Sequence, residues 1–213
     1  MSDRETLDTL LLLHGTTYAD EAGIRLRDTP QPLYQLLVLS DLLSARIRAS
    51  VAVASARALY AQGMRTPRRM AEATWQQRVD ALGEGGYRRY DERTATQLGD
   101  GAVQLLDAYG GDLRRLRRGA EGVTGAVREA LQRFPGVGPT GADIFLREVQ
   151  TVWPETAPYL DAKALQGAER LGLPTSPAAL TRLAKGRDPA VFAAALVRTA
   201  LDKDAAASVR SAA

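Results

Sequence analysis

Three glycines stand close together in the segment 134–146, FPGVGPTGADIFL. Gly136, Gly138 and Gly141 fall within six residues of one another, directly before an apolar run. A glycine inside a helix costs about 1 kcal/mol relative to alanine, so such a cluster indicates a tight turn or a close approach of another group to the backbone. Helix-like sequence lies on both sides of the glycines, which predicts a helix, a tight turn and a second helix.

The start of that second helix would leave backbone N–H groups without helical partners. These donors, together with the positive end of the helix dipole, attract anions, and a phosphate of a nucleic-acid backbone carries the matching charge. A glycine turn also joins helices in proteins that bind no anion. The glycines alone therefore leave two interpretations open, an anion-binding hairpin and a simple connection.

The elements that would position this segment are helical along nearly the whole chain. Ser2, Thr66 and Asp188 each have the pattern of a helix N-cap, the first as a capping box with Glu5 and the other two followed by proline. Apolar residues at three- and four-residue spacing predict further helices over residues 33–45, 47–60, 94–109, 123–134 and 141–153. The fold class that we expect is all-α.

The composition excludes several kinds of chemistry. The chain of 213 residues has no cysteine, which removes disulfides, thiolate metal sites, iron–sulfur clusters and thiol nucleophiles. Its one histidine, His14, cannot form a multi-histidine metal site, and we interpret it as a packed helix residue. No apolar run approaches the roughly 20 residues that span a bilayer, and the acidic start of the chain does not predict a secretory signal. The net charge of +3 permits a polyanionic partner.

The hairpin string resembles the helix-hairpin-helix of the endonuclease III-like (HhH-GPD) DNA glycosylase superfamily, in which L-P-G-V-G-x-x-T-A is typical. Downstream, the segment 159–173, YLDAKALQGAERLGL, is similar to the V-D-x-x-V pattern of that family. Upstream, residues 42–60 and 89–98 are similar to two further family segments. The resemblance covers roughly residues 30–175, and the hairpin and Asp161 carry most of its specificity.

This resemblance implies a two-lobed helical fold. We expect a central bundle over residues 30–152, which includes the helix-hairpin-helix at about 123–150, and a second lobe formed by residues 1–29 and 153–213. We also expect a cytoplasmic protein of bacterial type that binds double-stranded DNA without membrane contact. A monomer is the expected form, although the sequence does not establish the oligomeric state.

The resemblance implies a role for individual residues as well. It places Asp161 at the family's catalytic aspartate, whose carboxylate would stabilise the oxocarbenium character of the sugar and orient the attacking water. The implied DNA-binding residues are Gly136, Val137, Gly138, Thr140 and Gly141. The candidates for the base pocket, or for a wedge that fills the gap left by an extruded base, are Arg46, Arg89, Tyr90 and Lys163. From the residues alone, Asp161 could also be the N-cap of a helix over 162–171, and the two roles are compatible.

The sequence departs from the family pattern at informative positions. Thr140 stands where bifunctional members have a lysine nucleophile, so we expect base hydrolysis without strand cleavage. Lys163 is the nearest other amine, but the family keeps its amine on the hairpin. Arg46 stands where the family often has a glutamine, and the four-cysteine cluster loop is absent. No cofactor is expected, although a monovalent cation could bind the hairpin backbone.

Three functions remain open at this point. The first is a monofunctional DNA glycosylase of base-excision repair that removes a damaged or mismatched base. The second is a non-catalytic DNA-binding protein of the same fold, and the third is a helical interaction protein in which the hairpin is only a turn. An arginine-rich run over 112–122, DLRRLRRGAEG, lies shortly before the hairpin and fits either phosphate contact or a solvated face. No residue identifies which base would be excised.

Overall fold

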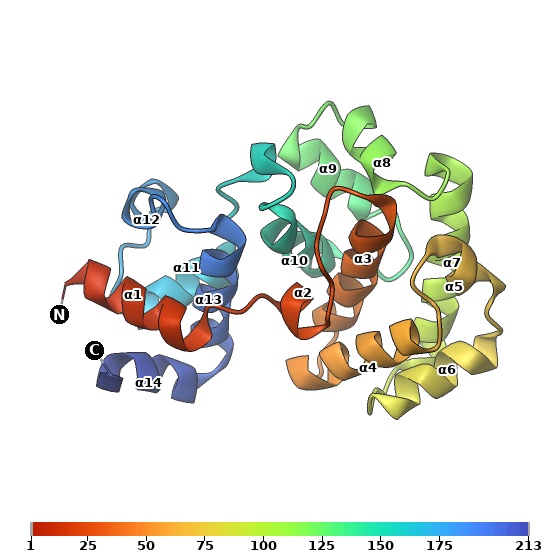
Figure 1. Ribbon diagram of the computed structural model, residues 1–213, viewed down its shortest axis with the longest axis horizontal. Coiled ribbons are helices and arrows are strands. Elements are labelled where there is room, and N and C mark those ends of the chain that lie inside the picture. Colours follow the sequence, from red (N-terminus) through yellow and green to blue (C-terminus); the bar gives the residue numbers. More distant parts are fainter. Residues whose placement is uncertain (1, 213) are drawn as a thin grey trace. The chain divides into compact units, whose positions relative to one another are not determined.

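The structure, a computed structural model, describes residues 2–212 (Figure 1). Within these residues all regular elements are helices and no strand occurs, so the all-α prediction is confirmed. The chain divides into two compact units. We call residues 19–146 the central unit, and residues 1–18 together with 147–213 the terminal unit. From the sequence we expected the lobes to change over at residues 30 and 153.

The helices follow one another with short connections. The central unit contains α3 (Pro30–Ser44), α4 (Ala49–Ala61), α5 (Pro67–Glu72), α6 (Trp75–Glu84), α7 (Asp91–Tyr109), α8 (Leu113–Gly119) and α9 (Thr124–Leu131). The terminal unit contains α1 (Asp3–His14), the short 3₁₀ helix η1 (Pro154–Thr156), α11 (Ala162–Arg170), α12 (Pro177–Leu183), α13 (Pro189–Leu201) and α14 (Lys203–Ala212). The two unit boundaries fall within α2 (Tyr18–Glu21) and α10 (Pro139–Val149).

The predicted helix starts are confirmed. Ser2 Oγ accepts a hydrogen bond from Glu5 N at 3.3 Å, and Glu5 Oε2 accepts one from Ser2 N at 2.8 Å, which completes the capping box. Thr66 accepts from Arg69 N at the start of α5, and Asp188 accepts from Ala190 N at the start of α13. These side chains satisfy backbone donors that a helix start would otherwise leave unpaired.

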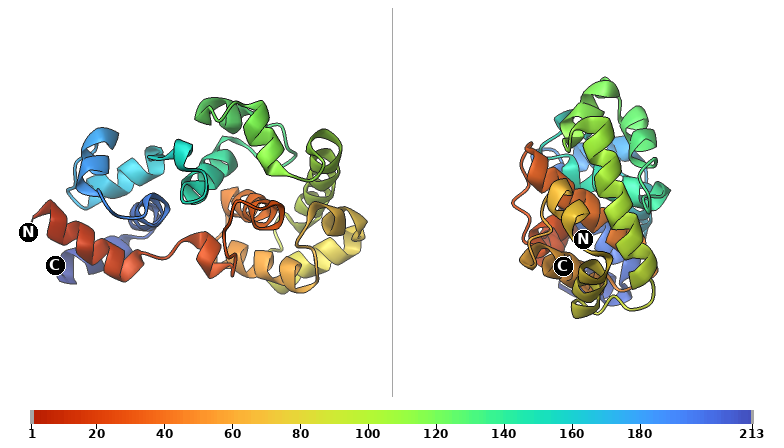
Figure 2. Two further views of the ribbon diagram at one scale, coloured as in Figure 1. Left: turned by 45° about the horizontal axis from the view of Figure 1, so that its top comes forward. Right: turned by 90° about the vertical axis from the view of Figure 1, so that its right-hand side faces the viewer.

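Helix α3 is the core of the central unit. The buried residues of this helix lie on all of its sides rather than in one stripe, which is typical of a central helix. Leu33, Leu36, Leu39 and Leu42 all have 0% of their surface exposed. The left view of Figure 2 looks nearly along α3 and shows α4 beside it. Other elements of the central unit are therefore positioned by packing against α3, at both of its ends.

An arginine that forms no ion pair within the described residues closes the packing of α5, α6 and α7. Arg78 is 9% exposed, and it donates to the carbonyl oxygens of Ala95 (2.7 Å), Met70 (3.0 Å) and Ala73 (2.7 Å). Two of these carbonyls belong to the C-terminal end of α5, where the helix dipole favours a cation. Burial lowers the pKa of Arg78, and the three carbonyl bonds compensate for the lost solvation.

In the terminal unit, α11 and α13 cross at very short range. A Cβ added to Gly167 of α11 would lie 1.8 Å from the carbonyl oxygen of Leu196 in α13. Thr199 Oγ1 of α13 closes the crossing by donating to the carbonyl oxygen of Gly167 in α11 at 3.3 Å. Leu7 and Val209 extend this core to α1 and α14, which lie beside α13 in Figure 1. Gly167 is thus required for the close contact between α11 and α13.

His14 lies at the end of α1, as the sequence analysis expected of a helix residue. Its Nε2 atom lies 3.1 Å from Ser208 Oγ of α14, and the residue is half-buried. This contact joins the first and last helices of the terminal unit.

Candidate functional site

The predicted hairpin joins α9 to α10. The chain leaves α9 after Leu131 and enters α10 at Pro139. Gly136 has a φ of +87°, a backbone conformation that L side chains rarely adopt. Two hydrogen bonds between residues close in sequence hold the turn. They run from Val137 N to Phe134 O and from Gly138 N to Gly136 O, both at 3.1 Å. The prediction of a helix, a tight glycine turn and a second helix is confirmed.

The three glycines of the hairpin have different structural roles. Gly136 makes the turn, and Gly141 packs closely, since a Cβ added to it would lie 3.4 Å from Val137 Cγ1 and 3.6 Å from the carbonyl oxygen of Ser40. Gly138 has no positive φ, and a Cβ added to it would meet nothing within 4 Å. The fold does not explain the glycine at 138, so its lack of a side chain leaves space open above the start of α10.

Several backbone donors near Gly138 in sequence have no partner within the described residues. Within residues 2–212 the N–H groups of Gly136, Thr140 and Gly141 have no hydrogen-bond partner. Pro139 contributes no donor, and Ala142 N is the first amide of α10 to find a carbonyl, that of Gly138 at 3.0 Å. Val137 is 5% exposed and anchors the turn from below. The hairpin therefore presents free donors and the positive end of a helix dipole at one place.

A buried carboxyl lies directly behind the hairpin. A Cβ added to Gly136 would lie 2.8 Å from Asp41 Oδ1, so the carboxyl of Asp41 in α3 fills the space that a larger residue would need. Asp41 is 9% exposed, and burial raises its pKa to about 7. Within residues 2–212 its carboxylate has neither an ion pair nor a hydrogen bond.

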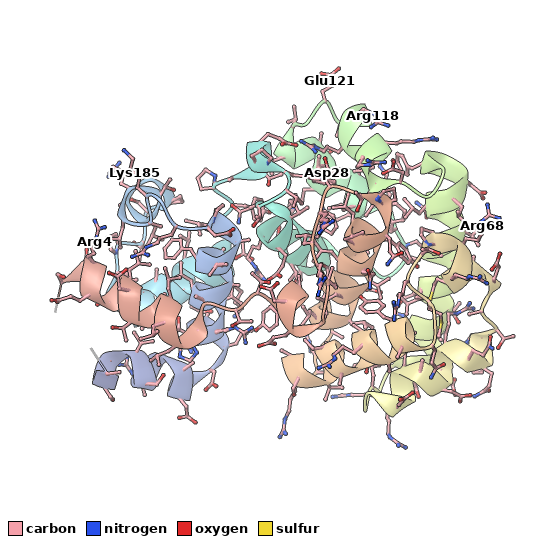
Figure 3. The ribbon with its side chains drawn as sticks, viewed as in Figure 1. Arg4, Asp28, Arg68, Arg118, Glu121 and Lys185 are labelled. Carbon is pink, nitrogen blue, oxygen red and sulfur yellow. The ribbon has the colours of Figure 1, made fainter. Side chains whose placement is uncertain are left out.

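The arginine-rich run of α8 is half neutralised by nearby acids. Arg114 pairs with Asp112 at 2.8 Å, and Arg117 pairs with Asp28, which Figure 3 labels, at 3.1 Å. Hydrogen bonds from Arg114 lower the pKa of Asp112. In the part of the chain that the structure describes, Arg115 and Arg118 are exposed and have no carboxylate partner. Only these two side chains of the run remain available for a phosphate.

The predicted wedge residues of the central unit lie in two places. Arg46 is exposed just beyond α3, at the end of that helix on which the hairpin packs, since Gly141 lies against Ser40 and Ser44. Arg89 stacks on Tyr90 with its guanidinium carbon 5.3 Å from the ring centroid, at the start of α7. Gly101 of α7 meets Pro135, so the Arg89–Tyr90 pair lies about 16 Å away from the hairpin along α7. The structure places Arg46 near the hairpin and the other two away from it.

In the terminal unit, Asp161 is the N-cap of α11, as the sequence allowed. Its Oδ1 accepts from Ala164 N at 3.0 Å, and its Oδ2 accepts from Arg147 Nη1 at 2.6 Å. The side chains of Arg147 and Asp161 are 6% and 11% exposed, so this is a largely buried ion pair. Both carboxylate oxygens are held in fixed directions, and the charge of Asp161 is balanced by the guanidinium.

Gln150 fixes the chain that leads to Asp161. Its Nε2 donates to the carbonyl oxygens of Arg147 (3.0 Å) and Tyr159 (3.2 Å), and its Oε1 accepts from Tyr159 N. Gln150 is 2% exposed. One buried amide thus ties the last turn of α10 to the segment that carries the aspartate.

Lys163 is exposed on the first turn of α11. Its Nζ donates to Gln166 Oε1 at 2.9 Å, one turn further along the same helix. The ammonium is thereby held along the surface of α11.

Sequence reasoning missed Arg147 and Asp41. The pattern had contained one hint, because Arg147 and Glu148 interrupt the apolar face of α10 and proved to be 5% and 2% exposed. A charged residue at a core position of a predicted helix indicates a buried ion pair. The same hint existed for Asp41, which stands between the leucines of α3.

Metal and membrane features are absent from the described chain. In residues 2–212 no group of three or more histidine or carboxylate side chains is placed to hold a metal ion. No helix in that range combines the length and the apolar character needed to cross a bilayer.

Comparison with known proteins identifies the fold. No family model matches the chain, and no curated protein matches it by sequence. Two solved structures of endonuclease III with DNA are similar to it. The first, a trapped covalent intermediate with an estranged adenine, has a TM-score of 0.53 at 16% identity, and the second, a non-covalent complex, has a TM-score of 0.54 at 17% identity. Each match covers 93% of this chain and 85% of the other.

The chain therefore has the helical fold of the DNA glycosylases that contain a helix-hairpin-helix. Within that class it has the endonuclease III-like arrangement, as the hairpin motif had predicted.

Proposed function

We propose that this protein is a monofunctional DNA glycosylase of base-excision repair. The hairpin carries the proposal: three unpartnered N–H groups and the open space above Gly138 would receive a phosphate of double-stranded DNA. Similarity to endonuclease III in complex with DNA supports the same binding mode. The proposal includes a monovalent cation held by hairpin carbonyl oxygens, and no step of the reaction depends on it.

Asp161 would promote the hydrolysis. As the bond between the base and C1′ of the sugar breaks, the base leaves with the bonding electrons and takes up a proton, while positive charge grows on the sugar. The carboxylate would stabilise that charge and direct water to C1′, where the new C–O bond forms. Arg147 and Ala164 N use one direction on each oxygen, which leaves the other lone pairs of the carboxylate for water or sugar.

Thr140 supports hydrolysis without strand cleavage. A threonine cannot form the Schiff base that precedes β-elimination, and the one lysine near Asp161 in sequence, Lys163, is bonded along its own helix. The expected product is an intact strand with an abasic site.

A second function, non-catalytic DNA binding, is favoured by the ion pair itself. Arg147 neutralises Asp161 in a place where only 11% of the aspartate side chain is exposed. A positive charge this close opposes the cationic sugar that the aspartate would have to stabilise. The same hairpin would then hold DNA without any base being released.

The deciding experiment is a panel of duplexes, each with one damaged or mismatched base, incubated with the protein and with its Asp161→Asn variant. Released base and strand nicks are measured before and after alkali. We expect nicks only after alkali, and none with the variant. Asp143→Asn is the matched control, because Asp143 is another arginine-paired aspartate, 2.6 Å from Arg128. Its base release should stay within about twofold of the unmodified protein.

Each alternative has its own outcome. No release from any duplex, with binding retained, would support the non-catalytic function. Release that persists in Asp161→Asn would reject the assigned residue but keep the enzyme. Since Asp161→Asn leaves Arg147 without its partner, DNA affinity and the unfolding temperature of the variant must be measured beside its activity.

A further inference from the structure

A polar pocket of about 350 Å³ lies in the central unit at the N-terminal end of α3. The turn after α2, the first turns of α3 and the C-terminal part of α4 form its walls. Figure 1 shows the chain between α2 and α3 running beside α3. No part of the proposed reaction uses this pocket.

Three arginines line the pocket, and none of its lining residues is acidic. Arg25, Arg57 and Arg65 are all exposed, and within residues 2–212 none of them has a carboxylate partner. Three positive charges at one pocket repel one another, so this arrangement costs free energy unless an anion is present.

One of these arginines is held in place. Arg65 Nε donates to the carbonyl oxygen of Tyr60 at 2.7 Å, which leaves both terminal nitrogens of its guanidinium free. The hydroxyl of Tyr60 in turn donates to the carbonyl oxygen of Gln35 at 2.7 Å. The wall of the pocket is therefore fixed by buried hydrogen bonds and does not rest on flexible side chains alone.

Gln35 adds an independent observation. The residue is 8% exposed and lines the pocket, yet its side-chain amide makes no hydrogen bond within the described residues. The amide still reaches solvent, since within the described residues Tyr34 Oη is the one fully buried side-chain polar atom without a partner. Its accessible direction is the pocket, where it could donate to a bound oxyanion.

The start of α3 also favours binding of an anion in this pocket. Thr29 makes no side-chain capping bond, and the first turn of this 15-residue helix has no acidic residue. Gln31 and Pro32 of that turn line the pocket. The positive end of the helix dipole is thus left uncompensated beside the three arginines.

We propose that this pocket binds a multiply charged phosphate, such as the diphosphate group of a small molecule. Guanidinium groups bind phosphate oxygens in pairs, and three of them without an acid match a ligand with several negative charges better than a single phosphodiester. The pocket is separate from the hairpin. Gly141 of the hairpin packs on Ser40 and Ser44, and Gln31 lies about 14 Å from Ser40 and about 20 Å from Ser44 along the same helix.

Titration calorimetry with inorganic pyrophosphate at constant ionic strength tests the proposal. We expect one site per chain, with affinity reduced at least tenfold in Arg57→Gln and at least threefold in Gln35→Met, which keeps every charge. The control is Arg68→Gln, an exposed arginine of α5 that lies outside the pocket and is labelled in Figure 3. Its affinity should change less than twofold.

Three results would overturn the proposal. The first is no heat of binding with pyrophosphate. The second is an equal loss in Arg68→Gln and Arg57→Gln, which would mean attraction to surface charge in general. The third is displacement of pyrophosphate by one equivalent of duplex DNA, together with weaker DNA binding in Arg57→Gln. That result would assign the pocket to the DNA-binding surface.

Discussion

Burial makes the charged form of Asp41 unfavourable in the native state. The carboxyl therefore stays protonated or ionises at a cost in free energy. Its pKa is about 7 in the folded chain because burial disfavours the charged form, against an ordinary value of 3.8. Tyr34 and Tyr87 are the titratable groups that interact with it, and Arg78 acts on Tyr34. Neither tyrosine brings a positive charge to Asp41, so nothing offsets the loss of solvation.

The consequence is a stability that falls as the pH rises. Between about pH 4 and pH 7 the unfolded chain has released this proton and the folded chain still holds it, so unfolding becomes easier with each pH unit. Asp41→Asn should remove the effect. At pH 8 the variant should be more stable than the unmodified protein, by up to about 4 kcal/mol, and at pH 4 the two should nearly agree.

Urea unfolding at pH 4, 6 and 8 measures this difference. Asp143→Asn is again the control, since Arg128 pairs with Asp143 and removing that ion pair should not make the protein more stable at any of the three pH values. A pH-independent difference for Asp41→Asn would mean that Asp41 has the same pKa in the folded and the unfolded chain.

Tyr34 provides a second prediction at the level of single residues. Its hydroxyl is buried without a hydrogen-bond partner, and burial raises its pKa. Tyr34→Phe removes a polar atom that gains nothing in the fold, so the variant should be more stable by about 1 kcal/mol. Thermal unfolding tests this, with Tyr60→Phe as the control that should lose stability, because the Tyr60 hydroxyl donates to Gln35 O. A destabilised Tyr34→Phe would contradict the assignment of an unpaired hydroxyl.

At the level of elements, the crossing of α11 and α13 depends on one glycine. Gly167→Ala would place a methyl group 1.8 Å from Leu196 O, a backbone atom that cannot move without shifting α13. We expect the free energy of unfolding to fall by more than about 4 kcal/mol, or the terminal unit to fail to fold. Gly83→Ala is the control. Gly83 lies in α6 with nothing within 4 Å of an added Cβ, so the same change should stabilise by up to about 1 kcal/mol.

Calorimetry measures the unfolding temperatures of the Gly167→Ala and Gly83→Ala variants and so tests both expectations. If Gly167→Ala unfolded at the temperature of the unmodified protein, α11 and α13 would have to be further apart than the structure places them.

Short sequence patterns predicted helix starts and the turn well, because the contacts that define them join residues close together in sequence. Ser2, Thr66, Asp161 and Asp188 cap helices through donors two or three residues away, so the pattern of residue types contains the whole contact. The turn at Gly136 is equally local. Helix ends were less exact: α4 begins at Ala49 and not at 47, and α10 ends at Val149 while the apolar spacing continued to 153. Pro154 then starts η1, which proline allows and a continuing α-helix does not.

Contacts between distant segments could not be predicted in this way. The pair of Arg147 with Asp161 and the approach of Asp41 to Gly136 each depend on how two helices pack, and no short spacing encodes that. The pocket of Arg25, Arg57 and Arg65 brings together three separate elements. The family resemblance predicted the fold, but each of these contacts includes at least one residue outside the motifs that carried the resemblance, such as Arg147, Asp41 or Arg65.

At the level of the whole molecule, the proposed DNA contact predicts a response to salt. The logarithm of the DNA affinity should fall linearly with the logarithm of the salt concentration, as counterions return to the phosphates. Gly138→Leu fills the space above the hairpin without adding charge. It should weaken binding to all duplex sequences alike and make the salt slope shallower by about one.

Fluorescence anisotropy at several salt concentrations measures both quantities. Gly125→Leu in α9 is the control, since an added Cβ there also meets nothing within 4 Å. Equal affinity of the Gly138→Leu variant and the unmodified protein at every salt concentration would remove the hairpin from the DNA-binding surface.

The terminal unit is built from both ends of the chain, and this has a consequence for synthesis. Leu7 and Leu10 of α1 pack with Phe192, Leu196 and Val209, which leave the ribosome after the whole central unit. Helix α1 must therefore wait, with its leucines uncovered, while residues 19–146 can already fold behind it. Of the two units, the one that carries Asp161 is completed second, so a chain truncated within α13 would have its hairpin formed while the core that packs against α11 is incomplete.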